Sequence, residues 1–464
     1  MTEADVKSVY ETDPMALRRH HLVAVTDTEA AVGNVGYTAA HLLCGLEKTA
    51  TIMSLVRHFS LSDPRAFTMK AADVVTVVHS YSALHIACYN GHSTEGLLRL
   101  LVQLDASQLN SIATGGGPLG LLCRYSEKLD ERLFRCLVEA DSSAEVVYDG
   151  IVGCIASTSL ENRVHAVAKL LEVNPAAAQH KGEDGHNLAH QACLYFDSMT
   201  ADDCIKVLKL VLARHKDALK EADVEGELPA HVAAGSGPVE VLDFVLGEYP
   251  EAAAVANNES QNLLHIAASH GPKVHLEVKV RLLCARHPNM MLQRNSDGDT
   301  PLLWACFRGR GALMQLLCEA GGQEAASAAV VHPTDAQYAF NGMLPLHYLI
   351  EFNALTLMTA PLSEAADAFR LLLRLYPEAA GTEGGVLKKT PYQLVVDEGL
   401  PTYYRRLLLR AAPHLNPAEL RRLAWAERRM AMFVAFAAVA KTPSLLARLR
   451  AENKDLVKHV VLFL

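Results

Sequence analysis

Apolar residues recur along most of the chain as pairs of amphipathic helices, and each pair is opened by the same kind of short segment. The clearest copy is Gly342-Met343-Leu344-Pro345-Leu346-His347. Variants of it stand at residues 36–41, 82–87, 117–122, 185–190, 226–231, 262–267, 298–303 and 390–393. Recurrence of one short unit predicts a solenoid of stacked repeats rather than a single closed core.

The residue before the proline-like position of each copy marks the start of a helix. These markers fall at residues 38, 82, 117, about 152, 187, 228, 262, 300, 344 and 390, and the copy near Val152 is the weakest. Thr, Ser or Asn at a marker can accept a backbone N–H of the first helical turn. Proline follows at 118, 229, 301, 345 and 391, where a missing N–H costs nothing.

A second apolar helix follows each signature and ends at a repeated stop. Val241 to Leu246 and Ala368 to Leu375 are two such helices. Tyr249-Pro250, Tyr376-Pro377 and Asn174-Pro175 follow the second helices, and proline cannot donate the next helical hydrogen bond. The predicted unit is therefore helix, turn, helix and loop.

The chain resembles an ankyrin-repeat protein over residues 36 to about 400. That family has a period of ~33 residues and a Thr-Pro-Leu-His-x-Ala signature. The marker intervals here range from 34 to 46 residues, so several of about ten units carry insertions. The resemblance implies an all-α repeat solenoid of helix-turn-helix units joined by short β-hairpin-like loops, with a concave groove that binds protein partners.

The histidine of the signature is interpreted as a structural residue. It falls close enough to the helix cap to hydrogen-bond with it or with the neighbouring repeat. Leu303 and Gln393 stand at this place in two copies, so the array tolerates its absence. The repeated histidines are His41, His85, His190, His231, His265 and His347.

The two ends of the chain are expected to cover the apolar faces of the array, which occupies residues 36–412. Residues 1–35 are predicted to form a partial N-terminal cap with helical spacing from Val6 to Val25. Residues 413–464 are predicted to be a helical C-terminal cap, with a first helix that starts at Asn416-Pro417-Ala418-Glu419 and runs to about Ala440.

Charge is distributed unevenly. The formal net charge is −9, which argues against a general nucleic-acid binder. Residues 401–464 hold twelve Lys or Arg against four Asp or Glu, a net charge of +8, so the first 400 residues carry −17. This basic C-terminal region is either a cap attracted to an acidic body or a docking site for an acidic partner or membrane surface.

The cysteines and the apolar runs indicate an intracellular protein. Five of the ten cysteines, Cys44, Cys88, Cys123, Cys193 and Cys306, share one place in their repeats, as small packed residues would and disulfides would not. Reduced thiols favour the cytoplasm, with the nucleus as an alternative. Neither a signal peptide nor a membrane-spanning run is indicated.

No arrangement of residues points to catalysis, a metal or a cofactor. Three His-x-x-Cys pairs lie in different repeats, whereas a zinc site needs about four converging ligands. Gly115-Gly116-Gly117 lacks the Lys-Ser/Thr of a phosphate-binding loop and is expected to be a hairpin tip. An enzyme is therefore the third hypothesis.

The candidate binding residues follow the small-residue register of each first helix, where the resemblance places the groove. Aromatic residues and arginine recur there, and these types are favoured at protein interfaces. The candidates are Tyr89, Asn90, Arg124, Tyr125, Tyr195, His270, Phe307, Arg308 and Phe352. The rings either face the groove or pack on inserted loops.

The first functional hypothesis is thus a non-catalytic adaptor or scaffold for an unidentified protein partner. The alternative is a structural or regulatory subunit that contacts a larger assembly through the basic C-terminal helices.

Overall fold

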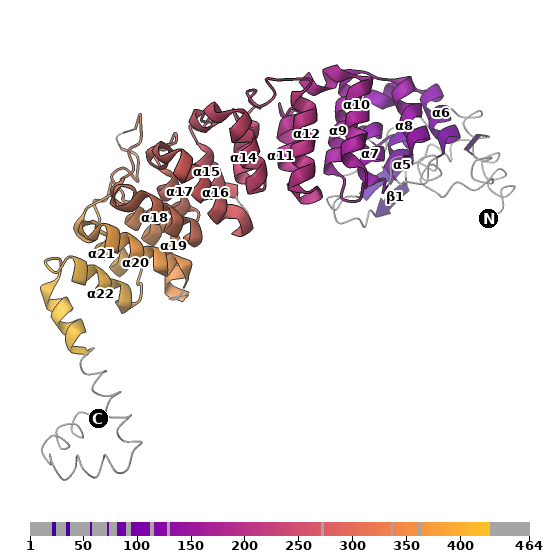
Figure 1. The fold of residues 1–464 in the computed structure, drawn as a ribbon. Coiled ribbons are helices and arrows are strands. Elements are labelled where there is room, and N and C mark those ends of the chain that lie inside the picture. The colour runs from indigo at the N-terminus through magenta and orange to yellow at the C-terminus, as the bar shows by residue number, and fades with distance from the viewer. Residues whose placement is uncertain are drawn as a thin grey trace, which may run out of the picture. The chain divides into compact units, whose positions relative to one another are not determined.

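The chain folds into successive pairs of short helices (Figure 1). The computed structural model describes residues 81–426, except 90–93, 112–115, 128–129, 271–272, 336 and 360–362, together with the segments 21–24, 34–37, 56–57 and 72–73. The first helices of the pairs are α5 (Ala83–Tyr89), α7 (Pro118–Tyr125), α9 (Ala144–Ala156), α11 (Leu188–Leu194), α13 (Pro229–Gly235), α15 (Leu263–His270), α17 (Pro301–Phe307), α19 (Pro345–Thr359) and α21 (Pro391–Asp397). The second helices are α6 (Glu95–Leu104), α8 (Glu131–Ala140), α10 (Arg163–Val173), α12 (Ala201–Leu212), α14 (Val239–Glu248), α16 (Lys273–Arg286), α18 (Gly311–Ser327), α20 (Glu364–Leu375) and α22 (Thr402–Ala411).

The chain divides into two compact units, residues 1–283 and 284–464. In unit 1, first helices pack on first helices from α5 to α15, and second helices pack on second helices, as α6 does on α8 and α12 on α14. In unit 2, the same two layers are α17, α19 and α21 against α18, α20 and α22. Each unit thus buries its apolar residues between two layers of helices, which is the predicted all-α repeat solenoid.

Proline and polar caps set the helix starts as predicted. Pro118, Pro229, Pro301, Pro345 and Pro391 are the first residues of α7, α13, α17, α19 and α21. The Asn187, Thr300 and Thr390 side chains each accept a backbone N–H from the first turn of the helix that follows. These contacts satisfy donors that a helix start would otherwise leave without a partner.

The predicted marker near Val152 is wrong. Helix α9 begins at Ala144, with Ser143 as its capping residue, so Val152 lies inside the helix. The true start has a serine without a proline behind it, which is why the repeated signature did not reveal it.

Glycine permits helices α7 and α9 to approach closely. A Cβ on Gly153 would lie 2.1 Å from the carbonyl oxygen of Gly120. The Asp149 carboxylate of α9 accepts the backbone N–H groups of Gly117, at 3.0 Å, and Gly120, at 2.8 Å. Gly117 of the predicted hairpin tip is thus the capping residue of α7, and its N–H is bound by the next helix pair, whereas Gly115 lies outside the described residues.

The segments between successive helix pairs form turns that hydrogen-bond to one another. The three proline stops open 3-10 helices: η3 (Pro175–Gln179), η5 (Pro250–Ala254) and η7 (Pro377–Gly381). The loops between repeats close as short hairpins, as where Asp223 N–H donates to the Glu227 carbonyl at 3.0 Å around a β-turn in which Gly226 N–H donates to the Asp223 carbonyl at 3.2 Å. Val224 N–H donates to the Asp184 carbonyl of the preceding loop at 3.2 Å. These are the β-hairpin-like loops predicted.

Buried donors from neighbouring helices hold the C-terminal ends of several first helices. Arg163 Nε donates to the Cys154 carbonyl of α9 at 3.0 Å, and Lys279 Nζ donates to the Ala234 carbonyl of α13 at 3.0 Å. Asn353 Nδ2 donates to the Cys306 carbonyl of α17 at 2.7 Å. The donors differ in type and in origin, so they follow no repeat pattern.

The described parts of the two ends differ from each other. β1 (His21–Ala24) pairs antiparallel with β2 (Asn34–Tyr37), which pairs with β3 (Ala72–Asp73). The helical spacing predicted for Val6–Val25 is therefore wrong at residues 21–24, while residues 6–20 and His41 lie outside the described residues.

Residues 417–426 are helical, as predicted from Asn416. Asn416 Oδ1 accepts the Glu419 N–H at 3.0 Å, and the Glu419 carboxylate accepts from Asn416 Nδ2 at 3.3 Å. The remainder of this helix and residues 442–464 lie outside the described residues.

Candidate functional site

The largest group of aromatic side chains in the described residues lies in unit 2, where first helices α17 and α19 meet. The ring centroids of Phe307 and Phe352 are 4.8 Å apart in an edge-to-face arrangement. Trp304 stacks on Phe307 at 5.3 Å, and Phe352 also contacts Tyr348 at 5.2 Å and Phe340 at 5.4 Å. We call these five residues the aromatic cluster.

Exposure changes across the aromatic cluster. Tyr348 is buried, with 2% of its surface exposed, and Phe307 is 41% exposed. Trp304, Phe340 and Phe352 are half-buried. The cluster is therefore anchored in the core at one end and reaches the surface at the other.

Arg308 lies at the exposed end of the aromatic cluster. It is the C-cap residue of α17, and its guanidinium carbon lies 5.2 Å from the centre of the Trp304 ring. The side chain is exposed. In the described part of the chain, no carboxylate lies within ion-pair distance of Arg308. A guanidinium held on an aromatic face keeps its N–H groups available for a carboxylate from another molecule.

Local backbone features explain how these side chains reach the surface. Helix α17 ends at Phe307 because Gly309 adopts a positive φ of 66°. Asn353 is non-helical, with φ −124° and ψ 19°, and α19 resumes beyond it to Thr359. On that extension Leu355 is 73% exposed. The extension therefore carries an exposed apolar residue three positions after Phe352.

Unit 1 holds a smaller group of candidate residues. The Tyr89 and Tyr125 ring centroids are 4.4 Å apart, and the Arg124 guanidinium carbon lies 5.9 Å from the centre of the Tyr125 ring. All three side chains are half-buried, as is Tyr195 at the end of α11. Asn90 and the side chain of His270 lie outside the described residues.

The repeated histidines lie inside the units. His347 Nδ1 accepts the Leu344 N–H at 3.1 Å, and its Nε2 lies 3.1 Å from both the Thr382 and Lys389 carbonyl oxygens. The same Nδ1 contact to the capping residue recurs at His85, His190, His231 and His265. Burial lowers the pKa of His190, His231 and His347 to about 4, so these rings are neutral at pH 7.

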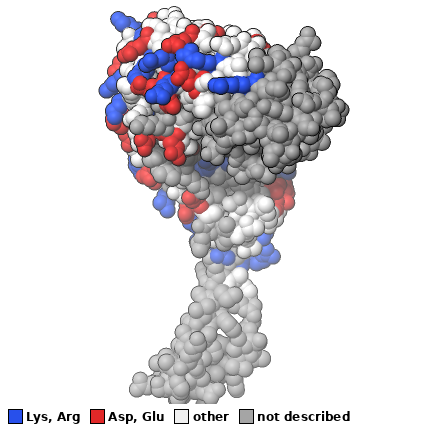
Figure 2. Space-filling view, turned by 90° about the vertical axis from the view of Figure 1, so that its right-hand side faces the viewer, with Lys and Arg blue, Asp and Glu red and all other residues white. Residues whose placement is uncertain are grey.

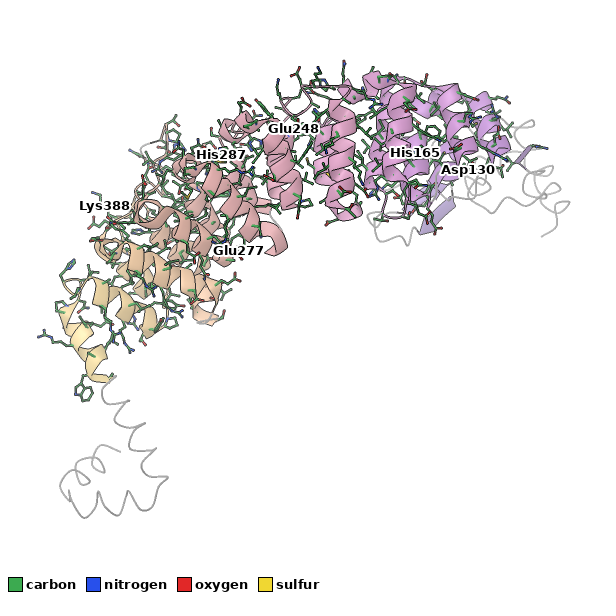
Figure 3. All side chains as sticks on the ribbon, viewed as in Figure 1. Asp130, His165, Glu248, Glu277, His287 and Lys388 are labelled. Atoms are coloured by element: carbon green, nitrogen blue, oxygen red, sulfur yellow. The ribbon has the colours of Figure 1, made fainter. Side chains whose placement is uncertain are left out.

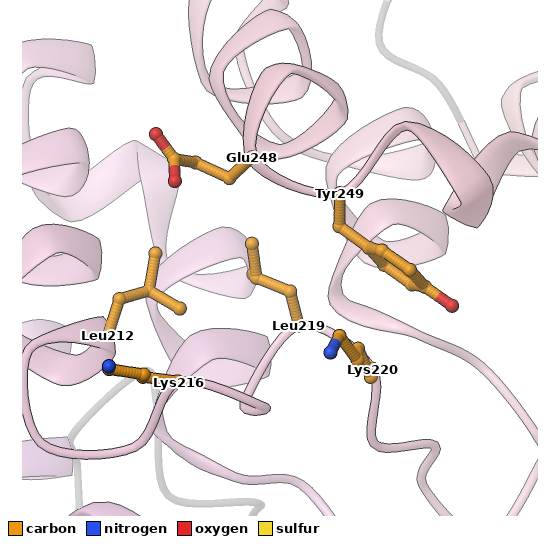
Figure 4. A pocket seen from close by; sticks show the side chains of 6 residues that line it. All are labelled: Leu212, Lys216, Leu219, Lys220, Glu248 and Tyr249. Atoms are coloured by element: carbon orange, nitrogen blue, oxygen red, sulfur yellow. The ribbon is translucent and has the colours of Figure 1, made fainter.

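A small cavity of about 270 Å³ lies in unit 1 between the ends of α12 and α14 (Figure 4). Leu212, Leu219 and Tyr249 supply its apolar lining, and Lys216, Lys220 and Glu248 its charged groups. Lys220 Nζ lies 2.7 Å from the Asp217 carboxylate, so one of the two cations is already paired. The mixed charge of this cavity selects no particular ligand.

Charged side chains elsewhere are paired across the second helices. Arg99 of α6 lies 3.4 Å from Glu139 of α8, and Lys169 of α10 contacts Glu131 of α8. Figure 2 shows described acidic and basic residues intermixed on the visible face. In the basic C-terminal region, Arg405 lies 3.2 Å from Glu419.

The comparisons with known proteins identify the repeats. Residues 249–329 match the family model described as ankyrin repeats, in three copies. The chain contains ankyrin repeats. No curated protein matches it.

Two solved ankyrin repeat domains are similar to this ankyrin-repeat protein. The ankyrin repeat domain of Bcl-3, described as a member of the IkappaB protein family, is 17% identical, with 57% of this chain and 97% of that chain covered and a TM-score of 0.38. The human ASB11 ankyrin repeat domain is 17% identical, with 54% and 98% covered and a TM-score of 0.36.

Ankyrin repeats are in general modules for protein–protein interaction. Over the described ranges, no helix has the length and apolar character that crossing a bilayer requires. The same residues contain no group of three or more His, Cys, Asp or Glu side chains placed to hold a metal ion. The nine described cysteines of this ankyrin-repeat protein are buried and free.

Sequence reasoning selected Phe307, Arg308 and Phe352 but missed the rest of the aromatic cluster. Phe340 comes from the long loop before α19, and Trp304 and Tyr348 lie at other positions of their helices. A usable signal was the 44-residue interval between markers 300 and 344, which contains Phe340.

Proposed function

We propose that this ankyrin-repeat protein is a non-catalytic adaptor that binds a protein partner through the exposed part of the aromatic cluster in unit 2. The proposal is carried by one observation: Phe307 and Arg308 are exposed beside Trp304, on a surface whose far end is anchored by buried Tyr348. Tryptophan, aromatic rings and arginine are the types that contribute most to interface energies. A rigid, anchored surface also loses little side-chain entropy on binding.

In this proposal the protein binds partners and catalyses no reaction, and its concave groove serves as a scaffold. Its location is the cytoplasm, with the nucleus as the alternative. Buried, free cysteines support a reducing compartment. The Tyr89–Tyr125 pair with Arg124 is proposed as a second contact in unit 1, because it repeats the combination of rings and arginine.

The test is a quantitative affinity purification with the full chain from its native cell, comparing wild type, Phe307→Ala and Tyr403→Ala. Tyr403 is a matched control because it is an aromatic residue, 37% exposed, on second helix α22 of the same unit. We expect at least one protein to be retained by wild type and Tyr403→Ala but depleted with Phe307→Ala. Equal recovery with all three proteins would reject the proposed site.

A companion variant separates binding from stability. Tyr125→Ala combined with Phe307→Ala is expected to weaken partner capture without lowering the melting temperature, because both rings are partly exposed. A marked loss of thermal stability would instead assign the two rings to the core.

A further inference from the structure

The C-terminal ends of the first helices in unit 2 carry opposite charges at opposite sides of the aromatic cluster. Arg308, at the end of α17, is exposed and bound to the Trp304 face. Glu351 on α19 and Glu398 at the end of α21 are also exposed, and Asp397 precedes Glu398. Since α19 packs between α17 and α21, the surface runs from cationic to apolar to acidic.

The acidic side has more negative than positive charge. Lys389 Nζ lies 2.8 Å from the Asp397 carboxylate. The pKa of Lys389 is raised by the hydrogen bond to Asp397 and by the nearby Glu351 and Glu398 carboxylates. One ammonium group thus lies near three carboxylates, and these four groups together carry a net charge of −2.

The middle of this surface is apolar. Phe307 is 41% exposed, and Leu355 on the extension of α19 is 73% exposed. Leu355 lies three residues beyond Phe352, the ring that contacts Phe307. Exposed large apolar side chains are a common sign of a binding surface. The apolar middle would supply most of the affinity for a partner, and the opposite charges at its two sides would fix the orientation of the bound partner.

We propose, on the basis of the function proposed above, that the partner presents one short segment with an acidic residue against Arg308, apolar residues against Phe307 and Leu355, and a basic residue against Glu351, Asp397 and Glu398. Packed helices are about 8–10 Å apart, so Arg308 at the end of α17 and Glu398 at the end of α21 are separated by about 16–20 Å, with Glu351 on the helix between them. An extended segment covers that distance in about six residues and a helix in about twelve.

The inference is tested by selecting random twelve-residue peptides displayed on phage against the full chain. We expect the selected peptides to carry Asp or Glu towards one end, Lys or Arg towards the other, and apolar or aromatic residues between them. Selected peptides without separated charges would overturn the inference.

Charge-reversed variants give the sharper result. With Arg308→Glu, we expect the acidic preference at one end to become basic while the other end is unchanged. With Glu398→Lys, the opposite end changes. For one selected peptide, each reversal should lower the affinity by about tenfold at low salt and by less at high salt, because exposed ion pairs are screened.

Matched controls are available in the same unit. Arg374→Glu on second helix α20 and Glu324→Lys on second helix α18 make the same charge changes at exposed positions in the other layer of helices. Both controls are expected to bind the selected peptides like wild type. An equal effect of a control and its partner variant would show that net charge alone is responsible, and would overturn the inference.

Failure of this inference and failure of the proposed function are distinguishable. If Phe307→Ala abolishes peptide binding while the charge reversals have no effect, the surface binds partners without the proposed polarity. If Phe307→Ala leaves peptide binding intact, the proposed site itself is wrong.

Discussion

Replacing His347 tests whether the repeated histidine stabilises the array by joining one helix pair to the loop before the next. The buried ring accepts the Leu344 N–H and lies 3.1 Å from the carbonyl oxygens of Thr382 and Lys389. His347→Ala removes these contacts and leaves an empty space. His347→Gln restores an acceptor, as at the last unit, where the Gln393 side chain accepts the Thr390 N–H at 2.8 Å.

The magnitudes follow from these contacts. A buried donor that loses its partner costs about 1–3 kcal/mol, and the lost ring volume adds a cavity cost of about 2 kcal/mol. We therefore expect His347→Ala to lower the free energy of unfolding of unit 2 by about 3–5 kcal/mol. His347→Gln should lower it by about 1–2 kcal/mol, since only the bridge to the next loop is lost.

The same ring produces a pH dependence. Burial lowers the pKa of His347 to about 4, whereas an unfolded histidine has a pKa of about 6.5. For a base with a lowered pKa, the stability is fully present above about pH 6.5 and is lost progressively as the pH falls from 6.5 to 4. Between pH 7 and 5 the wild type should lose about 2 kcal/mol from His347 alone, and His347→Gln should lose less.

The assay uses urea unfolding followed by tryptophan fluorescence. The chain has two tryptophans, Trp304 and Trp425, and both lie in unit 2. His414→Ala is the control, because His414 is exposed and its replacement should change stability by less than about 0.5 kcal/mol. The reasoning is refuted if His347→Gln is as destabilising as His347→Ala, or if His347→Ala costs less than about 1 kcal/mol.

Three further predictions concern buried polar groups. Burial raises the pKa of Asp149 to about 6, so its stability contribution is present below about pH 4 and lost as the pH rises through 6; calorimetry should show that Asp149→Asn removes this dependence. Asn353→Leu should cost about 1–3 kcal/mol and increase hydrogen exchange in α17, because the Cys306 carbonyl loses its donor. Burial lowers the pKa of Lys279 to about 8, so a stability cost of about 3 kcal/mol develops as the pH falls from about 10.5 to 8. Lys279→Met removes this cost but also removes the donor to the Ala234 carbonyl, worth about 1–3 kcal/mol, so thermal unfolding of unit 1 should show a gain of about 1 kcal/mol at pH 7 and a net loss near about pH 11.

The helix starts could be predicted from sequence because their causes are local. Pro229 and Pro391 start α13 and α21 whatever the rest of the chain does. The start of α9 was missed because Ser143 alone is a weak signal, and the close packing of Gly153 on Gly120 is visible only once both helices are placed.

The candidate site was predicted only in part. The positions of Phe307, Arg308 and Phe352 could be predicted because each is fixed by its spacing from the start of its own first helix. Phe340 could not be assigned, because it reaches the cluster from a long loop without helical periodicity. The conformation of such a loop is set by its tertiary contacts and not by local sequence. Figure 3 shows Lys388 in another such loop, between α20 and α21.

The ends of the first helices explain how the array combines a repeated structure with a variable surface. Several first helices start with a polar cap, such as Asn187, Thr300 or Thr390, whose replacement would cost stability. The carbonyl groups at the other end are bound by Arg163, Lys279 or Asn353, each from a different place in its neighbour. Because these buried donors already satisfy the helix end, the exposed residues just beyond it, such as Arg308, are not required for folding. Selection for a partner can therefore act on them, which is why we place binding at this end of the helices.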